Sequence, residues 1–208
     1  MTAGLFISLE GIDGVGKSTQ SDLLEEFLRG LGRDVVRTLE PGGTELGQEI
    51  RHLLLHRKGD VAPRAEALLY AADRAHHVAT KIRPALERGE VVITDRYLDS
   101  SVAYQGAGRA LKAEDVRAIS MFAVEGLLPE LTILLDLDAA AAAERRNKTG
   151  EAPDRLEREK IEFFEAVRQA FLDMAKAEPN RWLVVDARQS VEEMQAQIRA
   201  RVSQLLGA

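Results

Sequence analysis

Short apolar runs alternate with longer amphipathic stretches along this chain. The first run, Leu5 to Leu9, precedes "KSTQSDLLEEFLRGLG", in which apolar residues recur on one helical face. Strands that are apolar throughout and separated by helices are typical of a parallel sheet covered on both faces. We therefore expect a single α/β domain over 1–208, with a five-stranded parallel sheet flanked by helices. The expected strands are 5–9, 34–40, 91–95, 131–138 and 181–187, and the expected helices are 17–32, 44–56, 65–89, 113–126, from about 139, from about 156, and 190–206.

Individual residues refine this helical pattern. Pro84 predicts a break or kink in the stretch 65–89, because proline removes a backbone donor and crowds the preceding turn. Gly126 predicts the end of the helix at 113–126. The alanine run in "DAAAAAERR" is read as helix, since alanine is the best helix former. The expected buried face of the first helix consists of Leu23, Leu24, Phe27, Leu28 and Leu31.

A phosphate-binding loop lies between the first strand and the first helix. Gly11, Gly16, Lys17 and Ser18 satisfy the pattern G-x-x-x-x-G-K-[ST]. A glycine turn that opens a helix presents backbone N–H groups and the positive helix end, and both favour phosphate. Lys17 can reach the β- and γ-phosphates, and Ser18 can hold Mg²⁺. A chance glycine-rich turn would show the same letters, but the flanking strand and helix favour the functional interpretation.

Ionisable residues crowd the carboxyl ends of the expected strands, where ligands bind in open parallel sheets. Asp95 ends a buried strand, as does the carboxylate held near Mg²⁺ in phosphate-loop enzymes. Arg96 follows and offers a two-pronged donor for phosphate. A purely structural alternative is that Asp95 and Arg96 pair with each other and cap the next helix. Asp13 lies inside the loop and has two interpretations. Its carboxylate either accepts a hydrogen bond from a hydroxyl of a second substrate or stabilises the turn by bonding its own backbone.

Two further groups have weaker signals. Tyr70 and Arg74 are four residues apart on one helical face and could stack on and hydrogen-bond a base, although an aromatic at this spacing is more often part of a core. The basic segment "RRNKTG" (145–150) follows the fourth strand. It predicts a mobile lid at about 146–153 that supplies a cation absent from the phosphate loop, although a solvated charged surface is the commoner explanation.

Composition narrows the function classes. The 208 residues carry a formal net charge of -6, which argues against a surface for DNA or RNA. Cysteine is absent, which excludes disulfides and cysteine-based zinc sites. We see no signal peptide and no apolar run of membrane-spanning length, so we expect a cytoplasmic protein without a membrane partner. The four histidines form no metal pattern and are expected at surface helix positions; they are His52, His56, His76 and His77.

Taken together, the motifs resemble the bacterial thymidylate kinase family over nearly the whole chain. The matching segments are "GIDGVGKST", "EPGGT", "EALLYAADR", "DRYLDSSVAYQG" and "DRLE". The resemblance implies a P-loop nucleoside-monophosphate-kinase fold, a homodimer, and a requirement for Mg²⁺ with ATP. It also implies transfer of the γ-phosphoryl group of ATP to dTMP, giving dTDP and ADP in the route to dTTP.

The resemblance implies roles for single residues as well. Asp13 would take the 3′-hydroxyl of the deoxyribose, Tyr70 would stack on thymine, and Tyr104 would lie against the sugar. Catalysis would rest on Lys17, Asp95, Arg96 and a lid cation. The lid cation would be Arg146 or Arg145, in either case together with Lys148. Ser18 and Asp95 would hold the metal. ATP would contact Gly11, Ile12, Asp13, Gly14, Val15, Gly16, Lys17, Ser18 and Thr19. The nucleotide acceptor would contact Asp13, Glu40, Pro41, Arg51, Tyr70, Arg74, Arg96, Ser101, Tyr104 and Gln105, with Gly42 also shaping the floor.

This chain departs from the family pattern at two positions. The stacking residue is usually Phe and is Tyr70 here, so its hydroxyl needs a polar partner or water. Many relatives carry Arg directly before "EPGG", where this chain has Leu39. Positive charge near the site is therefore either missing or supplied by Arg37.

Three rival functions compete with this one, and the sequence disfavours two of them. Another nucleoside monophosphate kinase is disfavoured by "AYQG" and the Tyr70/Arg74 pair, which favour a pyrimidine. A GTPase switch needs an N-K-x-D element, but Asn147 and Lys148 are followed by Thr149 and Gly150. A structural phosphate-loop domain without turnover stays open on the sequence alone.

Overall fold

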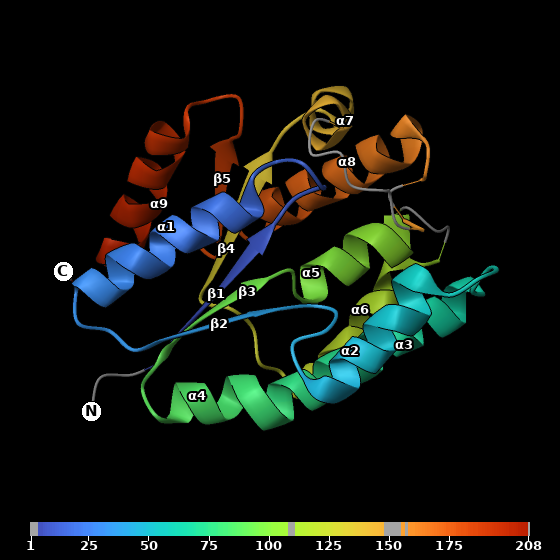
Figure 1. Cartoon of the computed structure of the whole chain (residues 1–208), viewed down its shortest axis with the longest axis horizontal. Coiled ribbons are helices and arrows are strands. Elements are labelled where there is room, and N and C mark those ends of the chain that lie inside the picture. The colour runs from blue at the N-terminus through green and yellow to red at the C-terminus, as the bar shows by residue number, and fades with distance from the viewer. Residues whose placement is uncertain (1–3, 108–110, 148–154, 157, 208) are drawn as a thin grey trace.

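A parallel sheet of five strands lies at the centre of the computed structural model, which describes residues 4–107, 111–147, 155, 156 and 158–207 (Figure 1). The sheet confirms the expected fold class, with strand order β2-β3-β1-β4-β5 and parallel pairing throughout. The strands are β1 (Leu5–Glu10), β2 (Val35–Leu39), β3 (Val91–Asp95), β4 (Leu131–Asp136) and β5 (Trp182–Asp186).

The register of the central strands positions the phosphate loop. Leu9 of β1 is paired with Asp95 of β3, and Glu10 with Leu134 of β4. The chain leaves β1 at Gly11, so the loop begins beside the end of β3. The segment that follows β2 begins at the same edge, because Leu39 is also paired with Asp95.

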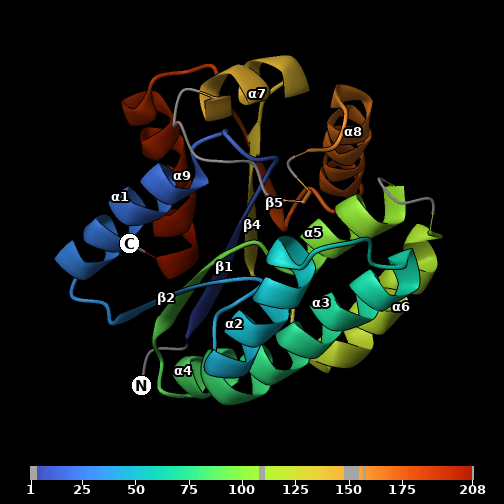
Figure 2. The ribbon, with the colours of Figure 1, turned by 45° about the vertical axis from the view of Figure 1, so that its right-hand side comes forward.

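Helices cover both faces of the sheet (Figures 1 and 2). Helices α1 and α9 pack together over one face, and α8 and α4 lie against the other, where α3, α5 and α6 join them. Helix α7 lies above the edge at which β4 ends. The α-helices are α1 (Lys17–Gly30), α2 (Glu45–Arg51), α3 (Pro63–His77), α4 (Arg83–Glu87), α5 (Leu98–Ser101), α6 (Ala113–Val124), α7 (Ala139–Asn147), α8 (Ile161–Ala177) and α9 (Val191–Leu206), with π-helical turns at His52–His56, Val78–Ile82 and Val102–Ala107.

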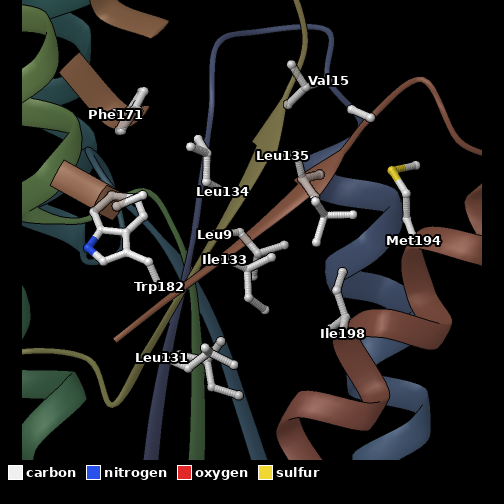
Figure 3. Close-up of a cluster of buried hydrophobic side chains, with 14 of the residues drawn as sticks. Leu9, Val15, Leu131, Ile133, Leu134, Leu135, Phe171, Trp182, Met194 and Ile198 are labelled. Carbon is white, nitrogen blue, oxygen red and sulfur yellow. The ribbon is translucent and has the colours of Figure 1, made fainter. Parts of the chain in front are cut away.

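The core continues through the sheet from one layer of helices to the other. Figure 3 shows Phe171 and Trp182 on one side of β4, and Met194 and Ile198 of α9 on the opposite side. Phe171, Ile198 and Ile133 of β4 are fully buried. Burial of such side chains contributes about 1.5–3 kcal/mol each, so both helical layers hold the sheet, and therefore its carboxyl edge, in place.

Several expected helix boundaries need correction. The helix expected from about Leu156 begins at Ile161, because Lys160 is extended and Leu156 packs into a separate small core instead. The segment 98–107 is helical, which the pattern did not predict. Leu31 lies just beyond α1 and is 46% exposed, so it is not part of the buried face, whereas Leu24 and Leu28 are buried.

The helix end predicted at Gly126 is confirmed, but the break predicted near Pro84 is not. The helical backbone continues from α3 through a π-helical turn into α4, with the proline in the first turn of α4. Helix α6 ends before Glu125 and Gly126, which both have left-handed backbone conformations with φ of 48° and 75°. A glycine adopts that conformation without steric cost.

Candidate active site

The phosphate loop leaves the N-terminus of α1 open. Gly16 precedes the helix in a left-handed conformation, and, among the described residues, no side chain caps this end. Gly14 packs so closely on α7 that an added Cβ would lie 2.4 Å from the carbonyl oxygen of Ala142. Lys17 Nζ donates to the carbonyl oxygens of Gly11 and Ile12, at 3.1 and 3.3 Å. The loop is thus a cradle of backbone donors with a cation folded across it.

A cleft of about 660 Å³, measured with its open mouth, lies beside the phosphate loop. The structure brings together in its wall all ten residues that the sequence assigned to the acceptor nucleotide: Asp13, Glu40, Pro41, Arg51, Tyr70, Arg74, Arg96, Ser101, Tyr104 and Gln105.

Within the described part of the chain, four further residues line the same cleft and were not predicted: Leu55, Tyr97, Ser100 and Leu156. Leu55 and Leu156 are apolar and belong to one small core with Tyr70. Since Leu156 comes from the segment after α7, the cleft is closed from that direction too. Only the motif "DRLE" hinted at this segment.

Arg96 joins the phosphate loop to the cleft. Its Nη2 donates to Asp13 Oδ1 at 2.7 Å and to Tyr104 Oη at 3.0 Å, and its Nη1 donates to Ser100 Oγ at 3.0 Å. The guanidinium also lies 4.8 Å from the centre of the Tyr104 ring. Its backbone has a φ of 68°, a conformation that costs energy for a residue other than glycine.

The charge of Asp13 is stabilised by its surroundings. Burial acts to raise the pKa of this carboxyl, but Arg96 and Lys17 outweigh it and hold the pKa well below its usual value. Asp13 is therefore a carboxylate that accepts hydrogen bonds, and the structural alternative of a turn residue bonded only to its own backbone does not describe it.

Asp95 and Ser18 are the residues expected to hold a metal. The Oδ1 atom of Asp95 is buried and has no hydrogen-bond partner within the described residues. Arg96 donates to Asp13, so the alternative in which Asp95 and Arg96 pair with each other finds no support. An unpartnered carboxylate oxygen at the end of β3, with an exposed hydroxyl at the start of α1, fits the oxygen ligands that Mg²⁺ prefers.

Glu40 forms a buried floor beneath the cleft. Arg74 Nε donates to its Oε2 at 2.6 Å, and His77 Nδ1 lies 2.9 Å from its Oε1. The other ring nitrogen of His77 lies 2.6 Å from Thr38 Oγ1. The surface position expected for His77 is therefore wrong: its ring is fully buried because two polar partners on neighbouring segments satisfy it.

Arg74 is fixed within the wall. Besides Glu40 it donates to the carbonyl oxygen of Tyr97 at 3.2 Å and to Ser101 Oγ at 3.0 Å, and it is only 1% exposed. Burial acts to lower the pKa of Arg74, but Glu40 and its hydrogen bond raise it, so the guanidinium stays charged. Arg74 thus offers the cleft a positive charge in a set orientation.

Arg37 does not supply positive charge to the cleft. It is paired with Asp22 and lies 3.5 Å from Glu25, both on α1. Leu39 is 38% exposed and is not in the cleft wall. Of the two alternatives for this position, the structure thus supports the one in which the charge before "EPGG" is missing.

Glu10 is a buried carboxyl that the sequence did not single out. It accepts hydrogen bonds from the backbone N–H of Tyr97 at 2.8 Å and from Ser100 Oγ at 2.5 Å. Burial, and next the nearby Asp99, raise the pKa of Glu10 to about 8. Arg96 N in turn donates to the carbonyl oxygen of Leu9 at 2.9 Å. The last two residues of β1 therefore hold the backbone at both Arg96 and Tyr97.

Two arginines at the end of α7 point differently. Arg145 donates to the carbonyl oxygen of Ala187, just after β5, at 2.9 Å. Arg146 lies 5.7 Å from the Phe164 ring and contributes to lowering the pKa of Asp13. Lys148 and the rest of the predicted lid after Asn147 lie outside the described residues.

A cluster of metal-binding side chains and a membrane-spanning helix are both absent from the described ranges. No three His, Cys, Asp or Glu side chains gather there as a metal cluster would require. None of the helices described has the length and apolar character needed to cross a membrane.

A phosphate loop on the central strand, beside a polar cleft lined by arginines, defines a P-loop enzyme that acts on nucleotides. The family model for thymidylate kinase matches residues 9–198, and the chain belongs to the thymidylate kinase family. It is 68% identical to a thymidylate kinase from Leifsonia xyli over 96% of this chain and 94% of that protein. It is 50% identical to one from Deinococcus radiodurans, over 98% of each.

A solved structure agrees with this assignment. The thymidylate kinase of Ehrlichia chaffeensis is similar with a TM-score of 0.78 and 31% identity, over 96% of this chain and 99% of that one. The similarity therefore extends over nearly the whole fold.

Proposed function

We propose that this chain transfers the γ-phosphoryl group of ATP to dTMP, giving dTDP and ADP, at the edge where β1 and β3 end. The observation that carries the proposal is the Asp13–Arg96 contact, which joins the donor loop to the acceptor cleft. The two substrates would then lie on either side of this pair, close enough for direct transfer.

The phosphate loop, residues 11–19, would hold the ATP phosphates through its backbone N–H groups. Lys17 would exchange its contacts with the loop carbonyls for the β- and γ-phosphates. Ser18 and Asp95 would hold Mg²⁺, which neutralises phosphate charge when bound. Asp95→Asn should raise the Mg²⁺ concentration needed for half-maximal binding of ATP, while wild-type affinity in Asp95→Asn would contradict this assignment.

The cleft would hold dTMP. Tyr70 would stack on the base, and Ser101 and Gln105 would hydrogen-bond its edge. Tyr104 would lie against the deoxyribose, and Asp13, as an ionised acceptor, would take its 3′-hydroxyl. Its phosphate and base would be surrounded by the arginines of the wall, Arg51, Arg74 and Arg96.

The transfer itself needs little acid–base chemistry. An ionised phosphate oxygen of dTMP attacks the γ-phosphorus, and the bond to the bridging oxygen breaks so that ADP leaves. Positioning and neutralisation of spread negative charge supply most of the rate. Lys17 and Arg96 would serve this role, and Arg146 is favoured over Arg145 because Arg146 acts on the charge of Asp13 in the loop, whereas Arg145 donates to Ala187.

A homodimer and a cytoplasmic location complete the proposal. Helices α2, α3 and α6 lie side by side (Figure 2) and carry the exposed side chains of Leu46, Leu68 and Phe122, of which Phe122 is 87% exposed. A second copy of the chain would cover such a face. Light scattering should give twice the chain mass, and Phe122→Asp should lower it; a monomer in the wild type would contradict the dimer.

Steady-state turnover of ATP with a panel of nucleoside monophosphates tests the function. ADP should form only with a monophosphate acceptor, and dTMP should give the highest kcat/KM. Equal turnover with purine monophosphates would support another monophosphate kinase. Hydrolysis of GTP without an acceptor would support a switch, and no turnover would support a structural domain.

A further inference from the structure

Gln105 has an amide whose orientation is set by a buried carboxylate. Its Nε2 donates to Glu66 Oε1 at 3.0 Å, and both side chains are buried, at 2% and 0% exposure. A carboxylate can only accept hydrogen bonds, so the NH₂ group of Gln105 must face Glu66. The group that Gln105 can offer to a ligand in the cleft is then its carbonyl oxygen.

Glu66 is in turn held by Arg155. The Nη2 of Arg155 donates to Glu66 Oε2, and its Nε donates to the carbonyl oxygen of Leu54 at 2.8 Å. A buried carboxylate without a partner is costly, and this ion pair provides a partner for the second carboxylate oxygen of Glu66 and fixes its position. Because Arg155 directly precedes Leu156 of the cleft wall, the same short segment closes the cleft and locks the amide.

We infer that Glu66, paired with Arg155, is a positioning residue that makes the cleft select the hydrogen-bonding edge of the base. This inference rests on the proposed function, in which Gln105 meets the base. A carbonyl oxygen at that place accepts the N3–H of thymine. Cytosine presents an acceptor at N3, so two lone pairs would face each other and neither would be satisfied.

A carboxylate-to-amide change removes the lock with almost no change in volume. In Glu66→Gln the new amide can meet Gln105 with either its oxygen or its NH₂ group, so the Gln105 amide is free to turn. We expect the ratio of kcat/KM for dTMP over dCMP to fall by about 10-fold, the effect of one misdirected hydrogen bond. Glu192→Gln, an exposed glutamate of α9, is the matched control and should leave the ratio unchanged.

A second variant and a double mutant keep the test decisive. Arg155→Met should lower the same ratio, since Glu66 Oε2 loses the guanidinium that holds the carboxylate in place. In a Gln105→Leu background, Glu66→Gln should have no further effect on the ratio, because no amide remains to be oriented. A merely structural role for Glu66 would lower turnover of both nucleotides equally and leave the ratio unmoved.

The possible results separate this inference from the proposed function. A wild type that prefers dTMP, with an unchanged ratio in folded Glu66→Gln and Arg155→Met, would overturn the inference alone. A further fall of the ratio in the Gln105→Leu background would overturn it as well. A wild type that does not phosphorylate dTMP would instead overturn the proposed function.

Discussion

Arg96 lies with its Nη2 2.7 Å from Asp13 Oδ1, and this contact links the loop after β1 to the residue after β3. Both partners line the cleft at the point where it meets the phosphate loop. Asp13 is 33% exposed and Arg96 16%, so the pair is largely shielded from solvent. Charged hydrogen bonds in such places are stronger than neutral ones and fix orientation.

Arg96→Lys should separate charge from geometry at this position. Lysine keeps the positive charge but cannot bridge Asp13, Ser100 and Tyr104 at once. We expect kcat to fall about 100-fold, with a smaller change in KM for ATP. Stopped-flow or coupled assays at saturating substrates would measure this, and a kcat within a few-fold of wild type would remove Arg96 from the catalytic group.

Glu10→Gln should change how stability depends on pH. The pKa of Glu10 is raised to about 8 by burial and Asp99, so the folded state binds more protons than the unfolded state between about pH 4.5 and 8. Stability therefore falls as the pH rises through this window. Glutamine does not titrate and can keep the contacts with Tyr97 and Ser100, so the variant should lose less stability between pH 5 and pH 8.

Urea unfolding at several pH values, without ligands, measures this difference. We expect the free energy of unfolding of the wild type to decline by at least about 1 kcal/mol more than that of Glu10→Gln over the window. Glu192→Gln serves as the control and should follow the wild type. Parallel curves for wild type and Glu10→Gln would show that Glu10 is not the titrating group.

Tyr104 should control the choice of sugar. Its ring packs against Phe163 and Phe171, and its hydroxyl meets Arg96. Tyr104→Phe keeps the ring and should keep the preference for dUMP over UMP. Tyr104→Ala should narrow that preference, although it should also cost about 3–5 kcal/mol of stability. If kcat/KM values for dUMP and UMP keep the same gap in folded Tyr104→Ala, another residue excludes the 2′-hydroxyl.

The two arginines of α7 should differ strongly in their effects. Arg146→Ala should lower kcat by about 1000-fold if Arg146 neutralises the transferring phosphoryl group. Arg145→Ala should change kcat little, since Arg145 is bonded to Ala187. The two variants have the same composition and change neighbouring residues of one helix, so each controls for the other. The opposite ranking would assign the cation to Arg145.

The sheet and the phosphate loop could be predicted because their signals are local. An apolar run predicts a buried strand, and the spacing of Gly11, Gly16 and Lys17 belongs to one turn. Ten residues of the cleft wall were predicted one by one, and only through the family resemblance. They come from five separate segments, and no periodicity in the sequence says that Tyr70 and Gln105 share a wall.

The failures have a common physical cause, which is tertiary contact between distant segments. His77 follows a helical pattern that fits a surface position, yet Glu40 and Thr38, 37 and 39 residues away, bury it. Leu156 fits the start of a helix, but the small core beside Tyr70 binds it instead. Glu66 opens the matching segment "EALLYAADR", but its role becomes visible only when Gln105 and Arg155 are placed beside it.

Transfer of label from γ-labelled ATP tests the central claim most directly. With dTMP present, the label should appear in dTDP at the rate of ADP formation, because the donor loop and the acceptor cleft form one site. Lys17→Ala, folded by circular dichroism, should lower that rate by orders of magnitude while leaving the product unchanged. Label released as inorganic phosphate, with dTMP recovered unmodified, would contradict the account.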